Sequence, residues 1–216
     1  MTPPSSLPSQ NSPNPPAIVF DFGGVLIDWD PRYLYRKLFN HDEQAMEQFL
    51  AEIGFFEWNA LQDAGRPLSE AIADLCTRHP QYCDLIRAYD QRYEEALNGP
   101  IPASIDILKR LQSAGFSLYG ISNWPAEKFQ LVRAKYDFFS WFKDMLISGE
   151  IGIAKPDPRI FHLLLDRIAR PAGECLLIDD TVINIDVAQS LGFRTIHFLS
   201  PGLLQDQLHK LGLLPA

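Results

Sequence analysis

The stretch AIVFDFGGVL, at residues 17–26, decides the fold class. Its first four residues form a short apolar run, which is typical of a strand buried on both faces of a sheet. Further apolar runs alternate with helical patterns along the chain. The runs lie at 116–121, 145–147 (weaker), 175–178 and 195–198, and the helical patterns at 104–113, 126–135, 159–168 and 182–191. This alternation predicts an α/β fold, with a Rossmann-like three-layer core around a parallel sheet.

The segment from residue 30 to residue 100 interrupts this alternation. Apolar residues recur there every three or four positions, as in Leu34 and Leu38, and no convincing strand is visible. We therefore expect a helical cap at 30–100, inserted between two parts of the Rossmann-like core at 17–29 and 101–216. Residues 1–16 hold six prolines among Ser, Asn and Gln, which indicates a disordered Pro-rich tail.

Composition narrows the classes of function. The net charge of -8 argues against nucleic acid as a partner, because phosphate backbones are bound mainly by clustered Lys and Arg. No signal peptide and no apolar run of membrane-spanning length is visible, so we expect a soluble cytoplasmic protein without a membrane partner. Cys76, Cys83 and Cys175 lack zinc-ligand spacing and are expected to be reduced, mostly buried thiols.

Polar residues follow the predicted strands or lie on the loops between them. They are Asp21, Ser122, Asn123, Lys155, Asp179 and Asp180. Each alone has an ordinary structural explanation, as a turn residue, a helix cap or a solvated loop cation. The carboxyl ends of parallel strands, however, meet at one edge of a sheet, where α/β proteins bind their ligands. Three carboxylates gathered there require neutralisation, and oxygen ligands suit Mg²⁺.

These motifs resemble those of the haloacid dehalogenase-like hydrolase superfamily, in the type with a helical C1 cap after the first strand. The matching pieces occur in the family's order at Val19–Leu26, Ile121–Asn123, Ile153–Pro158 and Leu177–Thr181. The Gly23-Gly24 pair also resembles the subgroup that contains bacterial glucose-1-phosphate phosphatases. The resemblance implies Mg²⁺-dependent hydrolysis of a small phosphorylated metabolite, a sugar-phosphate-like monoester, through an aspartyl-phosphate intermediate.

The resemblance also assigns roles to the matching residues. Asp21 would be the nucleophile that attacks phosphorus. Lys155 would screen the charge between nucleophile and phosphate. Ser122 and the backbone of Asn123 would bind the phosphoryl oxygens.

The same resemblance implies a set of Mg²⁺ ligands. They are the carboxylates of Asp21, Asp179 and Asp180 and the backbone carbonyl of Gly23. Whether Asp179 binds directly or through water stays open. For the leaving group, the expected cap residues are Trp58 and Arg66, with Arg32 and Arg36 as further candidates.

Gly23 departs from the family pattern. Most phosphatases of this family carry a second Asp two residues after the nucleophile, as acid for the leaving group and base for the water. Gly23 has no proton to give, and such a role is typically worth about 10²–10⁴ in rate. Either the leaving group is already good, as in an anomeric phosphate, or a cap carboxylate replaces the acid. The candidates are Asp28, Asp30, Glu57 and Asp63.

Two other functions stay open. A 2-haloacid dehalogenase would need no proton for its leaving halide. Those enzymes, however, use no metal. They carry Ser and Asn at the positions of Asp179 and Asp180, and an aromatic residue at the position of Gly23. Their water-activating Asp aligns here with Asn184. The second alternative is a non-catalytic phosphate-binding or interaction domain, which the loss of the acid at Gly23 would permit.

Overall fold

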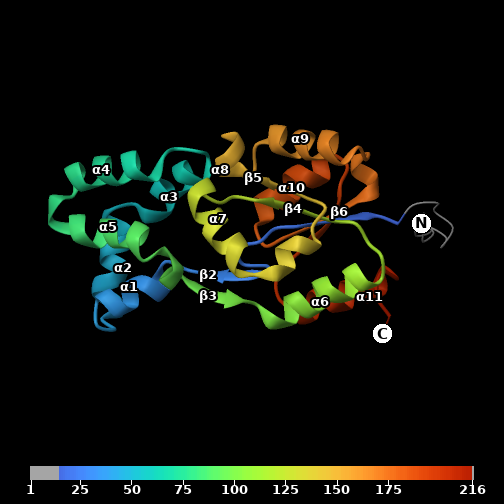
Figure 1. The fold of residues 1–216 in the computed structure, drawn as a ribbon, viewed down its shortest axis with the longest axis horizontal. Helices are drawn as coiled ribbons and strands as arrows, with labels where there is room; N and C mark the ends of the chain where they lie inside the picture. Colours follow the sequence, from blue (N-terminus) through green and yellow to red (C-terminus); the bar gives the residue numbers. More distant parts are fainter. Residues whose placement is uncertain (1–14, 216) are drawn as a thin grey trace, which may run out of the picture.

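Five parallel strands form the centre of the larger lobe in the computed structural model, which describes residues 15–215 (Figure 1). They are β1 (Ala17–Phe20), β4 (Leu118–Ser122), β5 (Asp144–Ile147), β6 (Cys175–Asp179) and β7 (Arg194–His197). Their order is β5-β4-β1-β6-β7, and all neighbours pair in parallel. The predicted α/β class with a Rossmann-like parallel sheet is confirmed.

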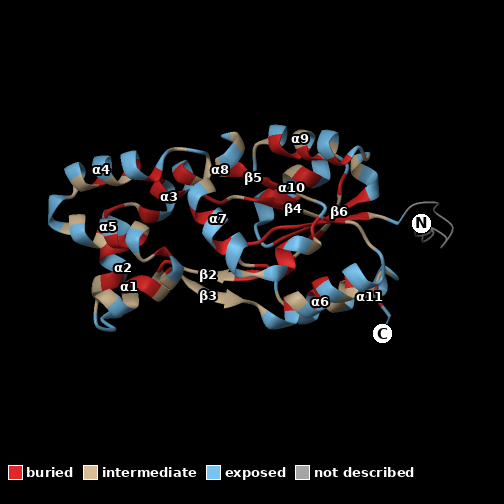
Figure 2. Cartoon of the chain, viewed as in Figure 1, coloured by how far each residue is buried: buried red, intermediate tan, exposed pale blue. Residues whose placement is uncertain are grey.

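Helices cover both faces of this sheet, as the alternation of strand and helix predicts. One face carries α6 (Pro102–Ser113) and α11 (Pro201–Lys210), and the other carries α9 (Pro158–Ile168) and α10 (Val182–Ser190) (Figure 1). Strand β1 serves both faces, because Ile18 and Phe20 pack into one apolar cluster while Ala17 and Val19 pack into the other. The sheet is accordingly the most buried part of the lobe (Figure 2).

Two further helices of this lobe lie near the carboxyl edge of the sheet. They are α7 (Ala126–Lys135), which follows β4, and the short α8 (Ser148–Ile151), which follows β5. The chain crosses from β5 on one side of β1 to β6 on the other. The carboxyl end of β1 therefore lies at the switch in strand order, where open α/β sheets form their binding crevice.

The smaller lobe is helical and is built from the segment after β1. Its helices are α1 (Arg32–Leu38), α2 (Glu43–Glu52), α3 (Phe55–Asp63), α4 (Leu68–Arg78) and α5 (Cys83–Gln91). Aromatic rings fill its centre: the centroid of Tyr89 lies 4.9 Å from that of Phe55 and 5.9 Å from that of Trp58. Edge-to-face contacts of this kind stabilise a core beyond the area they bury.

A pair of short strands joins the two lobes. Strands β2 (Ile27–Trp29) and β3 (Leu97–Pro100) run antiparallel, with Ile27 opposite Pro100. The expectation of no strand within residues 30–100 is wrong at β3. Its sequence, Leu-Asn-Gly-Pro, has no alternating pattern, and it is extended because β2 provides its hydrogen-bonding partner.

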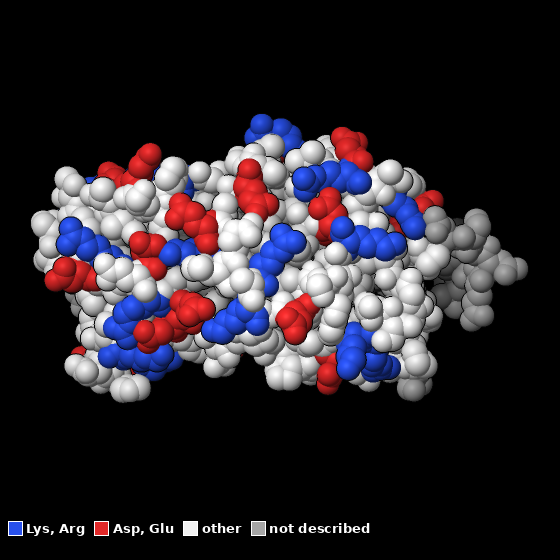
Figure 3. All heavy atoms as spheres, viewed as in Figure 1, with Lys and Arg blue, Asp and Glu red and all other residues white. Residues whose placement is uncertain are grey.

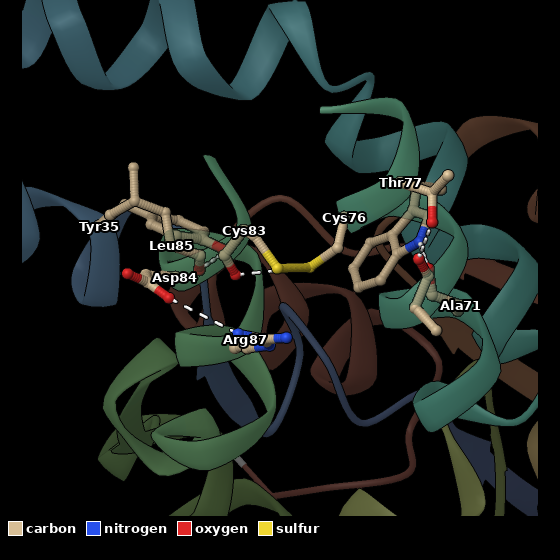
Figure 4. The surroundings of a disulfide bond; sticks show 10 residues. Tyr35, Ala71, Cys76, Thr77, Cys83, Asp84, Leu85 and Arg87 are labelled. Carbon is tan, nitrogen blue, oxygen red and sulfur yellow. Dashed lines mark hydrogen bonds and ion pairs between the residues drawn. A yellow bond between two sulfur atoms is a disulfide. The ribbon is translucent and has the colours of Figure 1, made fainter. Parts of the chain in front are cut away.

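The expectation of three reduced cysteines is wrong for Cys76 and Cys83, which form a disulfide between α4 and α5 (Figure 4). The cause is the tight antiparallel connection of these helices, which brings the two Cα atoms within 4.6 Å. Cys175 is free and buried, as expected. The cysteines therefore no longer support a reducing compartment.

Two surface properties of the described residues bear on partners. Within residues 15–215, no helix is long and apolar enough to cross a membrane. Acidic and basic side chains are interspersed on the face drawn in Figure 3, without an extended basic patch there. The predicted tail at residues 1–16 lies outside the described residues except for Pro15 and Pro16.

Candidate active site

Asp21 directly follows β1 and is fixed by three contacts. Its Oδ1 accepts hydrogen bonds from the backbone N–H of Phe22 at 2.6 Å and from the hydroxyl of Ser122 at 2.8 Å. Its Oδ2 lies 2.8 Å from Nζ of Lys155. Ser122 ends β4, the neighbouring strand. The sheet therefore holds the predicted nucleophile in one orientation at its carboxyl edge.

Lys155 lies under the same edge and is almost fully buried. Its Nζ donates to Oδ2 of Asp179 at 2.6 Å and to the carbonyl of Ile121 at 3.0 Å, besides its contact with Asp21. Burial disfavours its charge, but Asp21 and Asp179 outweigh that effect and the pKa of Lys155 is raised. A permanent cation therefore sits between two carboxylates.

The side chain of Asn123 positions Lys155. Its amide nitrogen donates to the Lys155 carbonyl, and its amide oxygen accepts from the Lys155 backbone N–H, both at 2.8 Å. This pairing joins the loop after β4 to the loop that carries the lysine. It occupies the Asn123 side chain and leaves the predicted contact with a phosphate to the backbone of this residue.

Asp179 and Asp180 are adjacent but differ in their surroundings. Asp179 is completely buried, and its oxygens accept from Lys155, from the amide of Asn184 at 3.0 and 3.2 Å, and from the backbone of Thr181 at 2.9 Å. Asp180 is exposed, and its carboxylate accepts a side-chain hydrogen bond from Thr181 at 3.2 Å. Asp180 therefore keeps oxygen atoms available for a ligand, whereas Asp179 is already saturated.

The three carboxylates form a cluster suited to a hard cation. Ligand oxygens of Asp21, Asp179 and Asp180 lie within 4.8 Å of one another. Burial raises the pKa of Asp21 to about 7, and repulsion from the two other carboxylates adds to the shift while Lys155 opposes it. One lysine thus leaves the cluster under-neutralised, and oxygen ligands of this kind fit Mg²⁺.

Gly24 allows the loop after β1 to close over this cluster. Its φ of +72° is in the left-handed region, and a Cβ at this position would lie 2.1 Å from Oδ2 of Asp180. A side chain at residue 24 would therefore occupy the space of the carboxylate. A side chain at residue 23 would meet no such obstacle, because the atom nearest to a Cβ there is a ring carbon of Trp124 at 4.0 Å.

A small cavity of about 50 Å³ opens beside Gly23, between core and cap. This is room for a few water-sized groups. Core and cap share its lining, which includes Gly23, Asn123 and Trp124 from the core and Asn59, Asp63 and Tyr93 from the cap. The motifs did not indicate Asn59 or Tyr93. Trp124 could have been found, because it directly follows Ser122-Asn123.

The structure does not bring Trp58 and Arg66 to this site. The indole of Trp58 packs in the cap core and donates to the carbonyl of Ala71 at 3.2 Å. Arg66 pairs with Asp74 of α4 at 3.2 Å. Both positions follow from helix packing inside the cap, which leaves neither side chain in the lining of the cavity.

The two other cap arginines are also engaged elsewhere. Arg32 pairs with Glu47 at 2.5 Å, and Arg36 pairs with Glu43 at the same distance. These ion pairs connect α1 to α2 on the exposed surface of the cap. Neither arginine lines the cavity beside Gly23.

A Rossmann-like α/β fold with three carboxylates gathered around one buried lysine at the carboxyl edge of its sheet defines the class of protein. The model of the haloacid dehalogenase-like hydrolase family matches residues 15–192. The chain belongs to this family.

Relatives and solved structures extend this finding. The chain is 25% identical over 182 residues to a sesquiterpene phosphatase from Aspergillus oryzae, with 84% of this chain and 88% of that protein covered. It is 26% identical over 197 residues to a drimenol cyclase from Aspergillus calidoustus, but spans only 35% of that protein's length while 89% of this chain is covered. An enzyme of the family from Bacteroides thetaiotaomicron, solved with magnesium and inorganic phosphate, has the same fold. Its TM-score is 0.63 at 23% identity, with 85% of this chain and 93% of that chain covered.

Proposed function

We propose that this chain is a Mg²⁺-dependent phosphatase that hydrolyses small, sugar-phosphate-like monoesters through an aspartyl-phosphate on Asp21. The observation that carries the proposal is the placement of Lys155, whose Nζ lies within 2.8 Å of both Asp21 and Asp179. A buried cation against the nucleophile offsets the repulsion between a carboxylate and an incoming phosphate dianion. The free carboxylate of Asp180 at the same edge supplies the remaining site for a metal ion.

The chain's own residues account for the first displacement. The oxygen of Asp21 that reacts forms a bond to phosphorus while the bond from phosphorus to the leaving oxygen breaks. The hydroxyl of Ser122 and the backbone of Phe22 hold the carboxylate in place through its Oδ1. Lys155 stabilises the negative charge that accumulates on the transferred group. Water then cleaves the aspartyl-phosphate and regenerates the carboxylate.

The proposed metal ligands are Asp21, Asp180 and the carbonyl of Gly23. Asp179 is assigned an indirect role, because its oxygens already accept from Lys155, Asn184 and Thr181. It would fix the lysine and reach the metal only through water. Bound Mg²⁺ would supply Lewis-acid polarisation of the phosphoryl oxygens.

The cavity beside Gly23 favours a small leaving group. Its volume of about 50 Å³ is too small for an extended body, and its lining includes the aromatic residues Trp29, Tyr93 and Trp124. A lining of aromatic rings suits a compact leaving group. This supports the sugar-phosphate-like class, and similarity to a phosphatase of the same length class supports phosphoester chemistry.

The dehalogenase alternative is less well supported. Asn184 stands where those enzymes have the Asp that activates water, and here its amide donates to both oxygens of Asp179. The acidic pair itself is a feature that metal-free halide displacement does not need. A metal-dependent reaction accounts for these residues better.

Hydrolysis of p-nitrophenyl phosphate with Mg²⁺, with excess chelator and by Asp21→Asn tests the proposal. Wild type should turn over only with metal, and Asp21→Asn should retain less than about 1% of its activity because the amide is no nucleophile. Asp144→Asn is the control, since Asp144 begins β5 at the opposite edge of the sheet. Undiminished activity in chelator, or chloride release from 2-chloropropionate, would overturn the phosphatase proposal.

A further inference from the structure

The cavity beside Gly23 is completed by a carboxylate from the cap. Asp63, the last residue of α3, lines it together with Gly23, although 40 positions separate the two in the sequence. The core side of the cavity has no group that transfers protons at the position of Gly23. The cap therefore offers a carboxylate on the side where the family pattern carries its acid.

Asp63 is held in place but not neutralised. Its Oδ2 accepts from the amide of Asn59, one helical turn earlier, at 3.1 Å. Within residues 15–215, no other hydrogen bond to its carboxylate and no ion pair with it is found, so Oδ1 is available. The turn that follows packs tightly on the core, since a Cβ at Gly65 would lie 3.1 Å from Cα of Gly152. Both contacts keep Asp63 at the cavity.

The other cap carboxylates are engaged elsewhere. Asp28 accepts from the hydroxyl of Tyr33 at 2.9 Å and from Asn98 at 2.9 Å. Asp30 accepts from the backbone and the guanidinium of Arg32. Glu57 is exposed and borders a different groove, which shares no lining residue with this cavity. None of these three lines the cavity beside Gly23.

The surroundings of Asp63 suit proton transfer near neutral pH. Burial raises the pKa of Asp63 to about 7, and Asp21 adds to the shift while Asn59 and Lys155 oppose it. Tyr89 and Tyr93 also face it, and burial raises the pKa of each tyrosine well above its usual value, so both stay neutral. A carboxyl group with a pKa near the working pH is suited to act as acid in one step and base in the next.

We propose that Asp63 is the general acid and base of this enzyme, replacing from the cap the acid that Gly23 lacks. The inference rests on the proposed phosphatase function. In the first step Asp21 bonds to phosphorus, the bond to the leaving oxygen breaks, and that oxygen takes the proton of Asp63. In the second step water attacks the phosphorus, ionised Asp63 takes the water proton, and the bond to Asp21 breaks. The products are an alcohol and inorganic phosphate.

Placement of the acid on the cap couples chemistry to closure. An acid two residues after the nucleophile is present whenever the core is folded, whereas Asp63 reaches the cavity only while the cap lies on the core. A poor leaving group would then react only in the closed state, which also excludes water from the site. Closure of the cap would thus control protonation of the leaving group as well as the entry of water into the site.

The test is Asp63→Asn, measured by kcat/KM on two Mg²⁺-dependent reactions. With n-butyl phosphate, whose leaving oxygen needs a proton, kcat/KM should fall by about 10²–10⁴. With p-nitrophenyl phosphate, whose leaving group needs none, it should fall less than about tenfold. The aspartyl-phosphate formed should then hydrolyse slowly for want of a base, so nitrophenolate should appear as a burst of about one equivalent before a slow steady state.

Two further variants separate catalysis from structure. Glu57→Gln removes a carboxylate from the same helix outside the cavity and should change neither reaction. Gly23→Asp in the Asp63→Asn background should recover part of the n-butyl phosphate activity, because a side chain at residue 23 meets no atom closer than 4.0 Å at its Cβ. A purely structural role of Asp63 would predict no such recovery.

The outcomes distinguish the inference from the function on which it rests. Equal losses on both esters, or no loss on n-butyl phosphate, would overturn the role of Asp63 and leave the phosphatase assignment standing. A folded wild type that hydrolyses neither ester with Mg²⁺ would overturn the proposed function and this inference with it. A difference between the esters without burst or recovery would also count against the acid-base role.

Discussion

The two sides of the cavity are built differently. On the core side, Asp21, Lys155 and Asp179 bond to one another and to the ends of adjacent strands, and all three are buried. On the cap side, Asn59 of the same helix is the one hydrogen-bond partner of the Asp63 carboxylate among the described residues. The core side is fixed by the sheet, whereas the cap side depends on how a separate helical lobe lies against it.

This difference divides the chemistry between the lobes. Transfer of a phosphoryl group to Asp21 requires the same charges for every substrate, so its residues belong on the rigid sheet. Protonation depends on the leaving group, which varies with the substrate and meets the cap. Damage to the core should therefore reduce activity on all esters alike, whereas damage to the cap should act according to the leaving group.

The largest uniform effect is expected from Asp180→Ala. Loss of the free carboxylate should weaken Mg²⁺ binding and lower kcat/KM roughly a thousandfold on aryl and alkyl esters alike, since metal stabilisation is worth several kcal/mol. Excess Mg²⁺ should not restore it fully. Calorimetric Mg²⁺ titration should show the weakened affinity. Asp186→Ala, at an exposed position on α10, is the control, and normal activity of Asp180→Ala would exclude Asp180 as a ligand.

A smaller uniform effect should come from Gly24→Ala, compared with Gly23→Ala. An alanine at φ +72° costs about 1–2 kcal/mol, and its Cβ would displace the Asp180 carboxylate. We expect loss of stability and at least a tenfold fall on both esters. Gly23→Ala has no backbone strain and should leave the melting temperature nearly unchanged. Equal melting temperatures of the two variants would refute the argument from backbone conformation.

The sequence predicted the core side well because its determinants are local. A buried apolar run ending in Asp21 and another ending in Asp179 identify strands and their carboxyl ends. Parallel topology then brings those ends together without any knowledge of side-chain packing. Even the weak run at residues 145–147 is the strand β5.

The cap side could not be predicted in the same way because its determinants are long-range. Asp28, Asp30, Glu57 and Asp63 look equivalent in sequence, and only the orientation of α3 against the core selects one of them. The direction of Trp58 is set by Phe55 of its own helix together with Tyr89 of α5, a partner 31 positions further along the chain. Strand β3 and the disulfide likewise depend on partners that no local pattern specifies.

An effect selective for the leaving group is expected from Lys128→Gln. Lys128 of α7 is buried and donates to the carbonyl of Asp90 on the cap at 2.9 Å and to its carboxylate at 2.5 Å. Since Asp90 is partly solvated, we expect a loss of about 1 kcal/mol in closure, or roughly fivefold in kcat/KM for n-butyl phosphate and less for p-nitrophenyl phosphate. Lys135→Gln removes the exposed contact of the same helix with Glu94 and should have little effect. Equal losses on both esters would argue against a closing role.

The smallest expected effect is on stability and isolates the ionisation of Asp63. Its pKa is raised from 3.8 to about 7 in the folded protein, so the folded state binds a proton that the unfolded state has released. Wild-type stability therefore carries a component that falls as pH rises from about 4 to about 7 and stays lost above it.

Asp63→Asn lacks this component, so its melting temperature should exceed that of wild type more at pH 8 than at pH 5. In chelator we expect that difference to change by at least about 2–4 °C between the two pH values, since each kcal/mol shifts the melting temperature of a chain of this size by about that much. Glu57→Gln should show a difference that is flat with pH. If the melting-temperature difference between Asp63→Asn and wild type also stays constant with pH, the Asp63 carboxylate is solvated in the folded, metal-free protein. The cap would then have to close before this group could act as a neutral acid.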